Sequence, residues 1–139
     1  MLGQYVKGFH HYGLPTRDME ATIGFYRKLG AQIVFETTVE EAGKPCRVVH
    51  LKVADVYVEA YERDEIAGVP GALDHFAVAT DDIEAAFAEA RRLGLPFAKE
   101  EIGVSDYWPG TARWFHLVGP SGERFEFAQQ QRAAFEDRP

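Results

Sequence analysis

Alternating apolar and polar positions divide the chain into short strands, and two stretches of helical periodicity interrupt them. Residues 8–14 and 73–79 each predict a strand, and the amphipathic helix that follows each one begins next to Asp18 or Asp82, which suit an N-cap. Three strands follow each helix, near residues 31–39, 46–53 and 56–62 and again near 96–100, 112–118 and 124–129. The predicted pattern is therefore βαβββ, present twice.

The two halves also share residues. Residues 11–30 and 75–94 align without a gap, and eight of the twenty positions are identical, including His11 with His75 and Gly30 with Gly94. Such self-similarity indicates an internal repeat. We expect one domain over 1–139 that contains a first module at 5–66 and a second at 72–130. The expected fold is α+β, with the two βαβββ modules forming an incomplete mixed β-barrel and the helices on its outer face.

The period of two along a strand assigns side chains to faces. In the first and last strands of each module, the large apolar residues are expected to face the helices. The alternate positions then place four polar residues on the other, concave face: His11, Glu59, His75 and Glu126. A carboxylate in mid-strand is costly unless it is paired or bound to a cation. Two imidazoles and two carboxylates suit a divalent transition metal.

Composition and charge argue against several classes of binding partner. The chain has 139 residues and a net charge of −7, which argues against nucleic acid and anionic membrane surfaces. No apolar run is long enough to span a bilayer, and no secretory signal is visible. Cys46 is the sole cysteine, which excludes an intrachain disulfide and a cysteine-based zinc site. We expect a cytoplasmic protein with a small-molecule substrate.

Three segments carry a family resemblance: "HYGLPTRDMEATIGFYRKLG", "HFAVATDDIEAAF" and "GPSGERFEFAQ". They resemble the vicinal oxygen chelate superfamily, the group of glyoxalase I, bleomycin resistance proteins and extradiol dioxygenases. The resemblance implies metal ligands on the first and last strands of each module, which are again His11, Glu59, His75 and Glu126. It also implies one divalent ion per site (Ni, Co, Zn, Fe or Mn) and a homodimer.

The His/Glu/His/Glu set is similar to that of bacterial glyoxalase I. The resemblance then implies a lyase or isomerase in which the metal stabilises an enediolate and a glutamate moves a proton, with Glu126 as first choice and Glu59 as second. No glutathione-binding pattern is recognisable, so the substrate stays open. Two alternatives also stay open: a bleomycin-resistance-like protein that sequesters a ligand, and an Fe(II) ring-cleaving dioxygenase.

Further residues are candidates for contact with the substrate. They are His50, Tyr57, Tyr61, Trp108 and Arg124. Arg124 shares the face of Glu126 and is favoured over Arg47 and Arg113 for an anionic group. His116 is a less favoured candidate for the same site, and His10 is expected to be a structural neighbour of His11.

Overall fold

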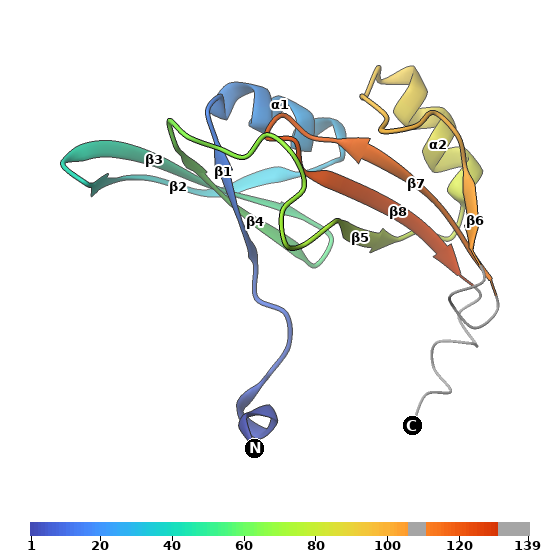
Figure 1. Ribbon diagram of the computed structural model, residues 1–139, viewed down its shortest axis with the longest axis horizontal. Coiled ribbons are helices and arrows are strands. Elements are labelled where there is room, and N and C mark those ends of the chain that lie inside the picture. Colours follow the sequence, from blue (N-terminus) through green and yellow to red (C-terminus); the bar gives the residue numbers. More distant parts are fainter. Residues whose placement is uncertain (106–110, 131–139) are drawn as a thin grey trace. The chain divides into compact units, whose positions relative to one another are not determined.

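A computed structural model describes residues 1–105 and 111–130 of the chain. The chain divides into two compact units, Met1–Ile66 and Ala67–Pro139. The first unit begins with a short 3₁₀ helix, Leu2–Tyr5, and continues with β1 (Tyr12–Thr16), α1 (Met19–Lys28), β2 (Gln32–Glu41), β3 (Lys44–Val53) and β4 (Val56–Glu62) (Figure 1). The second unit contains β5 (Phe76–Ala79), α2 (Ile83–Arg92), β6 (Gly103–Ser105), β7 (Ala112–Val118) and β8 (Arg124–Gln130).

Each unit is built on a four-stranded mixed sheet. The strand order is β1-β4-β3-β2 in the first unit and β5-β8-β7-β6 in the second. The first strand runs parallel to the last strand, and the remaining pairs are antiparallel. The register is repeated as well, since Gly13 lies opposite Glu59 and Ala77 lies opposite Glu126. The predicted α+β fold with two βαβββ modules is confirmed.

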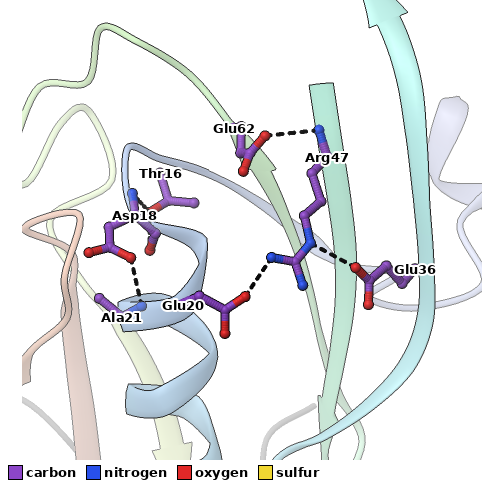
Figure 2. Close-up of polar contacts among 7 residues, drawn as sticks. All are labelled: Thr16, Asp18, Glu20, Ala21, Glu36, Arg47 and Glu62. Atoms are coloured by element: carbon purple, nitrogen blue, oxygen red, sulfur yellow. Dashed lines mark hydrogen bonds and ion pairs between the residues drawn. The ribbon is translucent and has the colours of Figure 1, made fainter. Parts of the chain in front are cut away.

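Both helices begin and end as the sequence predicts. The Asp18 carboxylate accepts a hydrogen bond from the backbone N–H of Ala21 at 2.9 Å (Figure 2), and Asp82 caps α2 in the same way at 3.0 Å. Gly30 and Gly94, just after the helices, have φ of 90° and 64°, a region that favours glycine. The repeated caps explain why the two helices have equal length.

The helix-facing residues of each sheet form its core. In the first unit Val49, Leu51 and Ala60 are fully buried, while the alternate positions of β3 and β4 stay partly exposed. In the second unit Phe115 and Leu117 are fully buried on β7. The predicted alternation is therefore confirmed, and each sheet keeps an open face, which we define as the face away from its helix.

Arg47 ties three elements of the first unit together. Its guanidinium donates to Glu20 on α1 at 2.6 Å and to Glu36 on β2 at 2.7 Å (Figure 2). These two hydrogen bonds raise the pKa of Arg47 above its ordinary value. Arg113 on β7 makes the equivalent contact with Glu84 on α2 at 2.6 Å. Both arginines are thus engaged in holding a helix against its sheet.

Two predicted boundaries are wrong. Residues 96–100 do not form a strand, since Phe97 makes only an isolated bridge to Leu117 and the third strand from the end is instead β6. The ring of Phe97 packs on Phe87 at 4.9 Å, so its apolar character reflects contact with α2. The first strands begin at Tyr12 and Phe76, later than expected, so that His11 and His75 directly precede them.

Candidate metal centre

Three side chains converge on the open face of the second sheet. His116 on β7 lies directly opposite Glu126 on β8, and its Nε2 is 2.6 Å from the carboxylate Oε2. His75, just before β5, places its own Nε2 3.6 Å from the same oxygen. One ligand atom from each of the three residues lies within 4.8 Å of the others. We call this set the second cluster; two imidazoles and a carboxylate form a donor set that fits divalent zinc, nickel, cobalt, iron or manganese.

Asp74 orients one of these histidines. Its carboxylate Oδ2 is 2.8 Å from Nδ1 of His75, on the far side of the ring from Glu126. The hydrogen bond with His75, and then the nearby charge of Arg124, hold the pKa of Asp74 below its ordinary value. A carboxylate on the outer nitrogen of a histidine is typical of metal sites, because it fixes the tautomer and turns the inner nitrogen toward the ion.

The second cluster is covered on its inner side. The side chains of His116 and Glu126 are only 15% and 14% exposed, whereas His75 is 41% exposed. A half-buried carboxylate has lost much of its hydration, and a bound cation would compensate for that loss. His75 is therefore the most exposed member of the second cluster.

The first unit carries a matching set, which we call the first cluster. His50 on β3 lies opposite Glu59 on β4, with Nε2 3.3 Å from the carboxylate Oε2, and the His11 Nε2 is 3.9 Å from that oxygen. The three side chains are 35% to 39% exposed. His11 is oriented by His10, whose Nδ1 lies 2.6 Å from the His11 Nδ1. The first cluster is therefore looser and more open than the second.

Within each unit, the structure brings two of the four predicted ligands together. His11 lies with Glu59 in the first unit, and His75 lies with Glu126 in the second. Each pair is joined by a histidine from the third strand of its module, His50 or His116, neither of which was predicted to be a ligand. A signal was present, because each of these two residues begins a His-Leu dipeptide at the same place in the repeat.

The predicted substrate contacts have varied surroundings. Tyr57 and Tyr61 flank Glu59 along β4, with Lys52 Nζ 5.0 Å from the Tyr57 ring centroid and the Arg63 guanidinium 4.7 Å from that of Tyr61. Arg124 faces Asp74, with 3.5 Å between guanidinium and carboxylate. Their roles toward a substrate stay predictions. Trp108 lies outside the described residues.

A recess of about 360 Å³ lies elsewhere in the first unit, beside the ends of β3 and β4. Cys46, Lys44 and Arg63 are among its lining residues. Two of its cations are paired, because Lys44 contacts Asp64 at 3.3 Å and Arg63 contacts Glu41 at 2.5 Å, while Arg17 donates to the backbone carbonyl of Asp64 at 2.8 Å. The recess contains neither cluster, and the converging ligand atoms are a stronger indication of chemistry than its volume.

The family follows from comparison with known proteins. Residues 8–127 match the Glyoxalase/Bleomycin resistance protein/Dioxygenase superfamily. The match covers both modules and most of the chain, so the chain belongs to this superfamily.

Individual relatives are more distant. The uncharacterized protein YwbC of Bacillus subtilis is 29% identical over 131 residues, which span 89% of this chain and 98% of that protein. A glyoxalase family protein from Enterococcus faecalis has a similar structure, with a TM-score of 0.74 and 22% identity over 89% of this chain and 98% of that one.

A third relative carries a metal. The fosfomycin resistance protein FosX from Listeria monocytogenes, solved with Mn(II) and a sulfate ion, matches with a TM-score of 0.70 and 13% identity over 95% of this chain and 99% of that one. At this identity the likeness shows the fold alone.

No helix in the described part of the chain is both long enough and apolar enough to cross a membrane.

Proposed function

We propose that the protein is a metal-dependent, glyoxalase I-like lyase or isomerase that acts on a small oxygen-chelating substrate. The observation that carries this proposal is the second cluster, in which His75, His116 and Glu126 converge and Asp74 fixes the ring of His75. Convergent nitrogen and oxygen donors with an orienting carboxylate are what a metal site requires.

The donor set is compatible with Ni, Co, Zn, Fe or Mn, because these metals share imidazole and carboxylate ligands. FosX was solved with Mn(II), which makes manganese a reasonable first ion to test. When bound, such an ion supplies a Lewis acid that polarises a substrate oxygen.

Glu126 is our first choice for the residue that moves the proton. Its carboxylate accepts a proton from one substrate carbon and returns it to the adjacent carbon, so that no net proton is gained or lost. His116 lies opposite Glu126, with its Nε2 2.6 Å from that carboxylate. Glu59 is the second choice, since it occupies the matching position of the first cluster.

The prediction that His11 and Glu59 also ligate the ion stays part of the proposal. Metal content of His11→Ala and His75→Ala tests it directly. Loss of the ion in both variants would support a set of four ligands, whereas loss in His75→Ala alone would assign the ion to the second cluster.

The activity itself is tested with hemithioacetals of glutathione and of other thiols. We expect turnover that disappears after chelator treatment and returns when metal is added. Glu126→Gln should abolish turnover, because it removes both the proposed proton carrier and a ligand of the second cluster. A ligand bound equally well with and without metal, and never converted, would favour a sequestering protein. Oxygen consumption with catechols and Fe(II) would favour a ring-cleaving dioxygenase.

The homodimer is also a proposal, which light scattering of the purified protein would test. The cytoplasmic location stays a prediction.

A further inference from the structure

Trp114 lies next to the second cluster on the same face of β7. It is paired across the sheet with Gly103 of β6, and a Cβ at position 103 would lie 2.6 to 2.8 Å from three atoms of the indole. The glycine therefore allows the indole to lie across β6. The indole is 4.9 Å from the His116 ring, centroid to centroid, with 35° between the planes.

Small residues extend from this indole across β8 to β5 on the same sheet. Ala128 lies opposite Trp114 on β8, Ala79 lies opposite Ala128 on β5, and Ala77 lies opposite Glu126. Ala77 and Ala79 are exposed, and Ala128 is half-buried. We call these three residues the alanine shelf. A single methyl group at each position leaves the surface between Trp114 and Glu126 low and uncharged.

The first unit differs at the matching positions. The partner of Val48 is Tyr61, which occupies the place of Ala128, and Pro15 occupies the place of Ala79. The Tyr61 ring is 3.4 Å from where a Cβ of Gly13 would lie, so it covers the position that matches Ala77. The first unit thus fills with a tyrosine the surface that the second unit leaves low.

We propose that the substrate of the second cluster carries a planar, apolar group, best an aromatic ring, that packs on the alanine shelf against Trp114. The proposal rests on the proposed function, because the oxygen atoms of the same molecule must reach the ion held by the second cluster. An indole offers a flat apolar face, which favours stacked or edge-on aromatic partners. The shelf carries no charge that would favour a charged group.

Two hydroxamates test the proposal. Benzohydroxamate and acetohydroxamate offer the same pair of donor oxygens and differ only in a phenyl or a methyl group. Calorimetric titration of the manganese-loaded protein should show benzohydroxamate binding about tenfold tighter. Trp114→Ala should reduce that ratio to about two, with the affinity for acetohydroxamate and the manganese content unchanged. Comparing ratios between variants cancels the intrinsic preference of the metal for either compound.

Three further variants make the test specific. Ala79→Leu fills the shelf and should weaken benzohydroxamate alone. Trp114→Phe keeps an aromatic ring and should retain most of the preference. Val48→Ala, at the position of the first unit that matches Trp114, should leave the ratio unchanged.

An unchanged ratio in both Trp114→Ala and Ala79→Leu would overturn the proposal. That outcome leaves metal and acetohydroxamate binding intact, so it is distinct from a failure of the proposed function. A protein that binds neither manganese nor any hydroxamate would overturn both proposals.

Discussion

The first and second clusters occupy the same positions of a repeated module, yet they differ in their surroundings. Glu126 is 14% exposed and lies 2.6 Å from His116, whereas Glu59 is 36% exposed and lies 3.3 Å from His50. The orienting partner differs too, since a carboxylate, Asp74, precedes His75 and an imidazole, His10, precedes His11. Duplication of the module therefore repeats the positions of these side chains without repeating their burial or their hydrogen-bond partners.

The lower exposure of Glu126 gives a physical reason to expect different affinities for a metal ion. A covered carboxylate is poorly hydrated, and a cation near it interacts through a lower effective dielectric than it would at an exposed position. We therefore expect the second cluster to dominate metal binding.

The largest change in manganese affinity is expected from removal of the third-strand histidines, His116 and His50. His116→Ala should weaken manganese binding about a hundredfold, because it removes one of the three donor atoms of the second cluster. His50→Ala, the matched change in the first cluster, should weaken it by no more than about tenfold. Calorimetric titration measures both, and equal losses would remove the distinction between the clusters.

The orienting residues should have a smaller effect. Asp74→Asn removes the negative charge behind His75 and should weaken manganese binding about tenfold. His10→Ala should change it less, since an imidazole orients its neighbour without contributing a fixed charge. A stronger effect from His10→Ala would show that the first cluster is the main site.

The helix caps should behave alike, in contrast to the clusters. Asp18→Ala and Asp82→Ala each remove one hydrogen bond to a helix N-terminus and should each lower the free energy of unfolding by about 1 kcal/mol. Urea denaturation followed by circular dichroism measures both. Unequal costs would mean that the two modules differ in their helices as well as in their ligands.

The contacts of Arg47 and Arg113 should have the smallest effect on the free energy of unfolding. Arg47 binds two glutamates and Arg113 one, in partly solvated positions. Arg47→Ala should lower the free energy of unfolding by about 0.5 kcal/mol, and Arg113→Ala by less. The same denaturation experiment applies, and added salt should reduce the difference between Arg47→Ala and the wild type. A larger cost for Arg113→Ala would contradict this ranking.

Local signals made much of the fold predictable. Asp18 and Gly30 mark the ends of α1 within the sequence itself, and the alternation of Val56, Val58 and Ala60 with polar residues identifies β4. The strand predicted at residues 96–100 is wrong because the apolar character of Phe97 comes from packing on α2. The sequence pattern alone does not distinguish such packing from a strand.

The site was predictable only in part. The repeat and the strand period identified His11 with Glu59 and His75 with Glu126 as residues of one face. The closeness of His116 to Glu126 was not predicted, because it depends on the register between β7 and β8. The contact between Trp114 and Gly103 likewise depends on pairing between strands and has no local signature.

The most direct test of the second cluster as a metal centre is a manganese titration of chelator-treated protein, with the wild type beside Glu126→Gln and the matched Glu59→Gln. The expected result is about one ion per chain for the wild type, loss of that ion in Glu126→Gln, and a weaker effect in Glu59→Gln. Less than about a tenth of an equivalent in the wild type across manganese, nickel, cobalt, zinc and iron, or unchanged binding in Glu126→Gln, would contradict it.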